Sequence, residues 1–165
     1  MAMNMAVIVL QADYANPVHA AALVVVLDAY AQDPMGGGHG LSGFAKTNLV
    51  PSLAARPQAY SVLAFVDDQP AGLVNCIEGF STFACRPLVN VHDVAVLAPY
   101  RGHGIAEKML ALAEGLARAR GACKLTLEVL SANAGAVRLY ERIGFAAYQL
   151  DPAMGQARFM QKLMV

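Results

Sequence analysis

A short segment in the second half of the chain has the residue types of a phosphate-binding loop. The segment is Arg101-Gly102-His103-Gly104-Ile105-Ala106. The run before it, residues 89–97, is rich in valine and predicts a β-strand. After it, apolar residues recur at the spacing of one helix face: Ile105, Met109, Leu112 and Leu116. The sequence therefore predicts a strand, a glycine-bearing turn and a helix N-terminus in succession.

This succession supplies what a phosphate group needs. The first N–H groups of a helix have no intrahelical acceptor, and the helix dipole places about half a positive charge at that end. Glycine at positions 102 and 104 lets a phosphate approach the backbone, and Arg101 adds a cation. We therefore expect a phosphorylated ligand at this turn.

Two common phosphate-binding loops do not match the segment. A P-loop has lysine and then serine or threonine after its last glycine, whereas Ile105 and Ala106 follow Gly104. A dinucleotide fingerprint has a third glycine where Glu107 stands. On these residues alone, an ordinary strand-to-helix turn remains the alternative.

Together with a second segment, the loop resembles the signature of the GNAT superfamily of acyl-CoA-dependent N-acetyltransferases. The pyrophosphate loop of that family is Arg/Gln-x-x-Gly-x-Gly/Ala, which Arg101, Gly104 and Ala106 match. The run from Asn133 to Phe145 is similar to the family's second element, Asn-x-x-Ala-x-x-x-Tyr-x-x-x-Gly-Phe. The two elements occur in the family's order and cover much of the C-terminal half.

The resemblance implies an α/β (α+β) fold of the GNAT type, as a single domain over residues 6–165. We expect a mixed, mainly antiparallel central sheet of six to seven strands, flanked by about four helices. The sequence predicts helices over residues 17–30, 42–55, 104–120 and 134–143. It predicts strands over residues 7–11, 60–66, 71–78, 89–97, 124–130, 145–148 and 157–164.

The resemblance also implies acetyl-CoA as the co-substrate. The strands at 89–97 and 124–130 are expected to splay apart after a bulge, so that the pantetheine arm bonds to the backbone of Val94, Ala95 and Val96. The pyrophosphate would lie on the loop, against Arg101, Gly102, His103, Gly104, Ile105 and Ala106. Asn133, Ala136 and Tyr140 would contact the cofactor farther along its arm.

Tyr140 is the candidate catalytic acid. In the family, this tyrosine reaches the thioester sulfur, and a phenol stays protonated at neutral pH, so it can donate to a departing thiolate. The alternative is a structural role, in which Tyr140 anchors a short helix beside Phe145.

The candidate base is His92, on the strand before the loop. Alternate residues of a strand share a face, which predicts Asn90, His92, Val94 and Val96 on one side and Asp93 on the other. Asn90 occupies the place of a glutamate found in some family members, and an amide cannot accept the proton. Histidine changes charge near neutral pH and suits general-base catalysis. The alternatives are a purely structural His92, and Glu78 as the base.

Bulk composition excludes several other classes of protein. The 165 residues are 57% hydrophobic and 15% charged, and the formal net charge is zero. We expect no nucleic-acid partner, since there is no basic surplus. The first basic residue is Lys46, which argues against a secretory signal, and the apolar run at 18–27 is too short to span a membrane. So much apolar sequence favours a homodimer.

The cysteines and histidines give no metal-binding pattern. Cys76, Cys85 and Cys123 are widely spaced, as in reduced cytoplasmic proteins, and the histidines lack ligand spacing. The sequence therefore predicts a cytoplasmic N-acetyltransferase without metal, acting on a primary amine, with a small molecule as the acceptor. The alternatives are a protein N-terminal or lysine acetyltransferase, and a non-catalytic acyl-CoA-binding sensor.

Overall fold

The computed structural model of the chain describes residues 6–148, 151–155 and 157–164. The chain falls into two compact units, Met1–Leu127 and Glu128–Val165. Within the described residues, the first unit contains one five-stranded sheet and three α-helices, and the second contains one α-helix. We describe each unit by itself, and a single domain over residues 6–165 stays a prediction.

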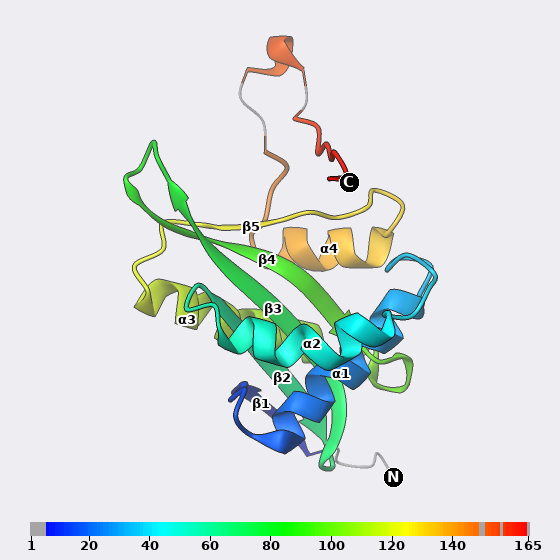
Figure 1. Ribbon diagram of the computed structural model, residues 1–165. Coiled ribbons are helices and arrows are strands. Elements are labelled where there is room, and N and C mark those ends of the chain that lie inside the picture. The colour runs from blue at the N-terminus through cyan, green and yellow to red at the C-terminus, as the bar shows by residue number, and fades with distance from the viewer. Residues whose placement is uncertain (1–5, 149–150, 156, 165) are drawn as a thin grey trace. The chain divides into compact units, whose positions relative to one another are not determined.

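The sheet has the strand order β1-β2-β3-β4-β5 (Figure 1). All neighbouring pairs are antiparallel except β4 and β5, which are parallel and connected through a helix. This confirms the prediction of a mixed, mainly antiparallel sheet. The strands are β1 (Val7–Gln11), β2 (Ala59–Val66), β3 (Gln69–Ser81), β4 (Arg86–Val96) and β5 (Leu125–Leu127).

A two-residue turn joins β2 to β3. Val66 pairs with Gln69, and the intervening Asp67 and Asp68 have φ angles of 47° and 63°. Positive φ at both central residues is the feature of a type I′ turn, which aspartate tolerates better than most side chains. The strands predicted at 60–66 and 71–78 are therefore joined as a β-hairpin.

The helices of the first unit are α1 (Pro17–Gln32), α2 (Gly43–Ala54) and α3 (Ile105–Ala119). Side chains cap the starts of the first two: Asn16 Oδ1 accepts from the Val18 N–H at 2.8 Å, and Ser42 Oγ accepts from the Ala45 N–H at 3.1 Å. After α3, Gly121 has a φ of 78°, the left-handed conformation that commonly ends a helix.

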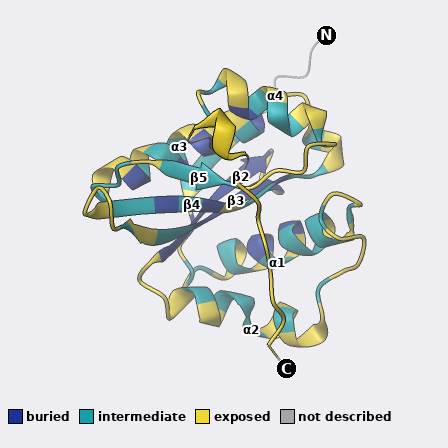
Figure 2. Ribbon diagram, turned by 90° about the horizontal axis from the view of Figure 1, so that it is seen from above, coloured by how far each residue is buried: buried dark blue, intermediate teal, exposed yellow. Residues whose placement is uncertain are grey.

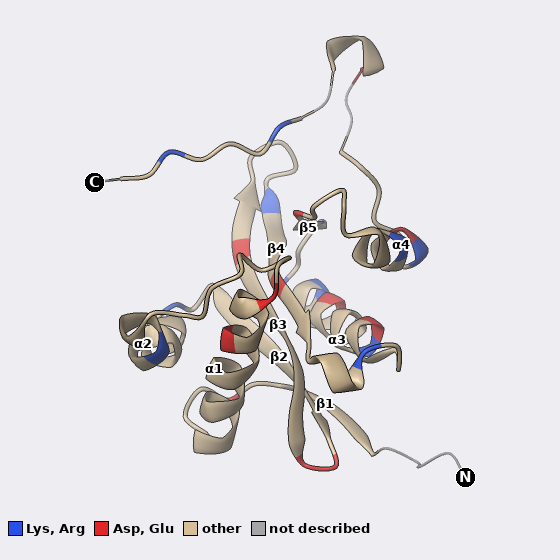
Figure 3. Ribbon diagram, turned by 90° about the vertical axis from the view of Figure 1, so that its right-hand side faces the viewer, with Lys and Arg blue, Asp and Glu red and all other residues tan. Residues whose placement is uncertain are grey.

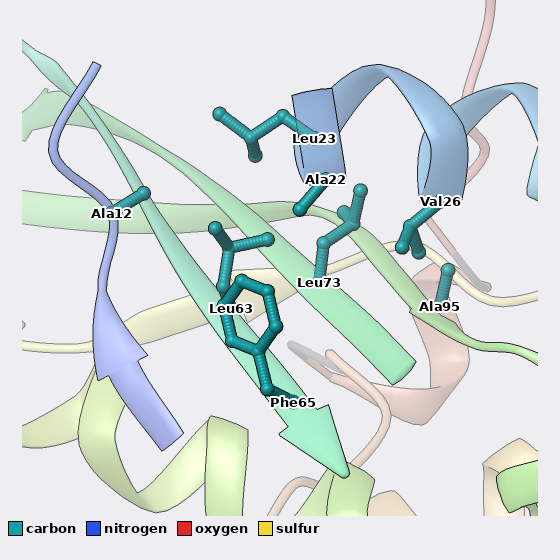
Figure 4. Packing of buried hydrophobic residues seen from close by; sticks show 8 residues of the cluster. All are labelled: Ala12, Ala22, Leu23, Val26, Leu63, Phe65, Leu73 and Ala95. Carbon is teal, nitrogen blue, oxygen red and sulfur yellow. The ribbon is translucent and has the colours of Figure 1, made fainter. Parts of the chain in front are cut away.

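Helices α1 and α3 pack on opposite faces of the sheet. On one face, alternate residues of the central strands meet α1 in an apolar cluster, which includes Leu63, Leu73 and Ala95 (Figure 4). On the other face, the Tyr60 hydroxyl donates to the Ala113 carbonyl of α3 at 2.9 Å. Because both faces are covered, β2 is buried along its whole length (Figure 2).

The strand count differs from the prediction. The described sheet has five strands rather than six to seven, since residues 145–148 and 157–164 form no strand and β5 ends at Leu127 instead of residue 130. The apolar residues at 157–164 suit a strand, but a strand needs a hydrogen-bonded neighbour, and these described residues have none. Within the described residues, the sheet therefore has one strand–helix–strand crossover, from β4 through α3 to β5.

The second unit is built around α4 (Ala134–Arg142). Asn133 caps its N-terminus, accepting from the Ala136 N–H at 3.2 Å. Near its other end, the ring of Tyr140 meets that of Phe145 edge-on, with centroids 5.9 Å apart. In the parts of the chain that the structure describes, no helix is both long and apolar enough to cross a bilayer.

Candidate functional site

A β-bulge in β4 lies at His92. Asn75 of β3 pairs with Asp93, and the next residue, Cys76, pairs with Val91, so His92 is an extra residue without a partner across the ladder. The predicted bulge is therefore present between β3 and β4. The parallel pairing of β4 with β5 ends at the same place, with Val91 opposite Leu127.

The bulge changes which face of the sheet each β4 side chain occupies. Directly paired residues share a face, so Asp93 lies with Asn75, and Ala95 lies with Leu73 on the α1 face. Val94 and Val96 consequently face α3. The prediction that Asp93 lies opposite to Asn90 and His92 is wrong, because strict alternation fails where one residue is inserted.

His92 is exposed, and a hydrogen bond orients its ring. The Nδ1 atom lies 3.3 Å from Asn90 Oδ1, while Asn90 Nδ2 donates to Thr126 Oγ1 at 3.2 Å. Since the Asn90 amide turns its donor toward Thr126, its oxygen accepts from His92 Nδ1–H. This arrangement leaves the proton on Nδ1 and the lone pair on Nε2, the form that accepts a proton.

A chain of polar side chains crosses the α1 face and ends at Asp93. Asn75 Nδ2 donates to Asp93 Oδ2 at 2.9 Å, Ser61 Oγ donates to Asn75 Oδ1 at 2.6 Å, and Tyr14 Oη lies 2.9 Å from Ser61 Oγ. Ser61 and Asn75 are 0% and 4% exposed. Sequence alone did not point to this chain; the available signal was Ser61 and Asn75, each inside an otherwise apolar run, at 59–66 and 71–77.

Glu78, the second candidate base, occupies the other face of the sheet. It lies three positions from Asn75, so its side chain is directed toward α3. Its carboxylate forms an ion pair with Arg120 at 3.1 Å, and that guanidinium lies 4.7 Å from the centre of the Tyr60 ring. The structure therefore does not bring Glu78 and His92 together.

The glycine loop has the geometry of an anion cradle. Gly102 and Gly104 have φ angles of 81° and 72°, which favour glycine, and a Cβ at either would meet no described atom within 4 Å. Gly104 is the N-cap of α3, and the Lys108 N–H bonds to its carbonyl at 3.1 Å. The N–H groups of residues 105–107 precede this first helical bond, so they can bind an anion.

The Arg101 side chain is held by protein groups. Its Nε donates to the Val96 carbonyl at 2.9 Å, and its guanidinium pairs with Asp33 at 3.1 Å. A backbone hydrogen bond from Met35 and this pairing hold the pKa of Asp33 below its usual value. Arg101 therefore joins the end of α1 to the loop, in addition to carrying the charge that the sequence analysis noted.

The backbone of β4 beyond the bulge can bind an extended ligand. The Leu97 N–H bonds to Ala71 of β3 at 2.8 Å, so by alternation the backbone groups of Ala95 also point to β3. Those of Val94 and Val96 point the opposite way, where no described strand pairs with β4 past Val91. The backbone groups of Val94 and Val96 therefore point away from β3, and the Val96 carbonyl already accepts from Arg101 Nε. That Val94, Ala95 and Val96 bind the cofactor stays a prediction.

The remaining predicted residues lie in the second unit. Asn133 and Ala136 bond to each other at the start of α4, and Tyr140 is 9% exposed. Among the described residues, no three His, Cys, Asp or Glu side chains gather as they would around a metal ion. Helices α3 and α4 each carry both acidic and basic residues (Figure 3).

Comparisons with known proteins agree with this geometry. The sequence model of the acetyltransferase (GNAT) family matches residues 27–145. The chain is 41% identical over 68 residues to streptothricin acetyltransferase of Streptomyces lavendulae, covering 41% of this chain and 36% of the relative. It is 39% identical over 74 residues to N-alpha-acetyltransferase 40 of Saccharomyces cerevisiae, covering 41% of this chain and 26% of that protein.

The chain thus spans only about a third of the length of these curated relatives. Over its whole length it is similar in fold to a solved structure described as a probable acetyltransferase. That likeness has a TM-score of 0.79 at 19% identity and covers 96% of this chain and 99% of the other.

Proposed function

Because the chain belongs to the acetyltransferase (GNAT) family, we propose that it moves the acetyl group of acetyl-CoA to a primary amine by direct attack in a ternary complex. The observation that carries this proposal is the loop at residues 101–106. Two left-handed glycines leave open space above the first N–H groups of α3. That cradle fits the pyrophosphate of coenzyme A, and the outward backbone of Val94 and Val96 fits its pantetheine arm.

The reaction needs a proton acceptor and a proton donor. The amine nitrogen attacks the thioester carbon, the carbon–sulfur bond breaks, and the amine loses a proton while the thiolate gains one. We assign the acceptor to His92 Nε2, supported by the bond that holds the other ring nitrogen to Asn90. We assign the donor to Tyr140, supported by its place in the family motif.

Glu78 is assigned a structural role. Its ion pair with Arg120 and its place on the α3 face both support that assignment. Asn133 and Ala136 are proposed to contact the cofactor arm, in keeping with the motif that contains them.

The proposed acceptor is a small-molecule amine. Streptothricin acetyltransferase, with which this chain shares 41% identity over 68 residues, supports that class. Similarity to N-alpha-acetyltransferase 40 supports the second candidate, the N-terminal amine of a protein. A non-catalytic acyl-CoA sensor would retain the cradle and release no CoA.

We also propose a single domain over residues 6–165, a cytoplasmic location and a homodimer. Large apolar side chains on the first two helices support the dimer, since Val18, Val25 and Phe44 are 60%, 54% and 79% exposed.

An assay that traps the free thiol of CoA tests the proposed function. Purified protein with acetyl-CoA should release CoA in the presence of one or more members of a primary-amine panel, and far more slowly without amine. The panel should include small amines and peptides with a free N-terminus, so that it separates the two acceptor classes. Binding of acetyl-CoA without release across the panel would favour the sensor.

A further inference from the structure

The polar chain that ends at Asp93 has a defined direction. Ser61 uses its single hydroxyl proton toward Asn75 Oδ1, so Tyr14 must donate to Ser61. Asn75 in turn donates to Asp93 Oδ2. Every bond thus points its donor toward the carboxylate, and hydrogen bonds that polarise one another in this way strengthen the whole chain.

The hydrogen-bond partner of Asp93 is the neutral Asn75 amide, whereas four carboxylates of the first unit pair with a cation. Asp28, Asp33, Glu78 and Glu114 each lie within 4.0 Å of a lysine or arginine nitrogen. No basic nitrogen of the described residues comes that close to Asp93. The buried side chains of Asn75 and Ser61 hold the Asp93 carboxylate in one orientation. In the part of the chain that is described, this carboxylate has no counter-cation.

Asp93 also lies beside the proposed base. The bulge places Asp93 on the α1 face together with Asn90 and His92, so carboxylate and imidazole are neighbours there. The Tyr30 phenol of α1 is close to this charge: burial raises its pKa most, and the charges of Asp93 and Asp33 raise it further. The α1 face of β4 is therefore negative next to His92.

We propose that Asp93 binds the ammonium group of the acceptor, and that Tyr14, Ser61 and Asn75 are positioning residues that hold its carboxylate. The acceptor class is then an amine that arrives as a cation, rather than a neutral or weakly basic one such as an aniline. This inference rests on the proposed function, since it names the substrate class of the same site.

The first test removes the charge and keeps the shape. Asp93→Asn should raise KM for the best panel amine about tenfold to a hundredfold, the range expected for a hydrogen bond to a charged group, while KM for acetyl-CoA stays unchanged. Asp28→Asn is the matched control, because it removes the same charge from an ion pair with Lys46. An unchanged amine KM in Asp93→Asn would overturn the proposal.

A second measurement separates this inference from the proposed function. Ethylammonium chloride replaces sodium chloride at constant ionic strength, and the backbone amide resonances of residues 92–94 are followed by NMR. Saturable shifts should occur in the wild type and in Asp28→Asn, and disappear in Asp93→Asn. Saturation without turnover of any amine would reject the proposed function alone, whereas a wild type without saturation rejects the ammonium site.

The positioning chain is tested at Tyr14 and Ser61, the two members farthest from Asp93. Tyr14→Phe should raise the amine KM about threefold to tenfold, since it removes one neutral hydrogen bond. Ser61→Ala should raise it at least as much, since it removes the bonds to both Tyr14 and Asn75. Ser61→Thr retains the hydroxyl and should return the amine KM toward the wild-type value. A loss of melting temperature with an unchanged amine KM in both variants would show that the chain only stabilises the fold.

Discussion

At the scale of single residues, the insertion of His92 into β4 determines which side chains can work together. Before the bulge, Asn90 faces α1; after it, Asp93 faces α1 as well, because one extra residue reverses the alternation. On a regular strand, the side chains of the consecutive residues His92 and Asp93 would point to opposite faces. The bulge therefore allows a base and an ammonium-binding carboxylate to occupy adjacent positions.

The proposed role of His92 predicts a specific kinetic defect. His92→Ala should lower turnover about 10²–10⁴-fold, the usual contribution of general-base catalysis. Because the side chain is exposed, melting temperature and acetyl-CoA affinity should change little. Turnover at the wild-type level would make His92 structural.

Tyr140→Phe tests the proposed acid. The change keeps the ring and its edge-on contact with Phe145, and it removes the one proton that the phenol can give. Turnover should fall by about one to three powers of ten, at about 1.4 kcal/mol of activation free energy for each. Differential scanning fluorimetry should show a melting temperature and an acetyl-CoA shift close to those of the wild type. A less stable variant with full turnover would identify Tyr140 as an anchor of α4.

The sequence supports part of the residue-scale description. The glycines at 102 and 104, and the caps Asn16 and Ser42, follow from residue type, since each satisfies a local backbone requirement. The face of Asp93 and its bond to Asn75 do not, because a bulge depends on pairing with another strand. The Arg101–Asp33 pair joins residues 68 positions apart and also has no local signal.

At the scale of elements, a glycine of the same backbone conformation flanks each end of α3, but the helix dipole has the opposite sign at the two ends. Gly104 before the helix and Gly121 after it have φ angles of 72° and 78°, and a Cβ at either meets no described atom within 4 Å. The dipole of α3 is positive at Gly104 and negative at Gly121. Only the first end is expected to attract a phosphate.

This symmetry provides a matched pair of variants. Gly104→Val and Gly121→Val should each cost about 1–2 kcal/mol of stability from left-handed strain. Acetyl-CoA at a hundred times its Kd should stabilise the wild type and Gly121→Val by about 2.7 kcal/mol, and Gly104→Val by almost nothing, since the valine fills the cradle. Thermal shift titrations measure the difference. An equal shift in both variants would mean that the cofactor pyrophosphate binds elsewhere.

Elements with local signals agree with the prediction, and elements that need a distant partner do not. Helices α1 to α4 begin at or within one residue of the predicted starts, because caps and helical periodicity are short-range features. The segments at 145–148 and 157–164 have apolar residues but form no strand in the described part of the chain. Apolar content alone does not specify a sheet.

At the scale of the whole molecule, the first unit keeps ionisable groups neutral inside its core. Burial raises the pKa of the Cys76 thiol from 9.0 to about 11, and burial is also the main reason that the pKa of Tyr60 is raised. Both lie on the α3 face, next to the Arg120–Glu78 ion pair. In this part of the protein, ionisation of the core opposes folding.

The alkaline stability of the protein should therefore depend on Cys76. The pKa of the thiol is about 11 in the folded state, and its usual value is 9.0. The contribution of the protonated thiol to the free energy of unfolding is therefore complete below pH 9 and is lost as the pH rises through 11. The unfolded chain releases the proton first, so the free energy of unfolding should fall by about 2 kcal/mol between pH 8 and pH 11 from this group.

Urea unfolding at a series of pH values, with a reductant present, measures this effect. Cys76→Ala should be less stable than the wild type at pH 7 by about 1 kcal/mol, and should lose less stability as pH rises to 11. Cys85→Ala is the control, because that thiol is exposed, and its curve should follow the wild type. Parallel curves for all three proteins would mean that the Cys76 thiol titrates alike in the folded and unfolded chains. The alkaline loss of stability would then have to come from Tyr60, whose pKa is also raised by burial.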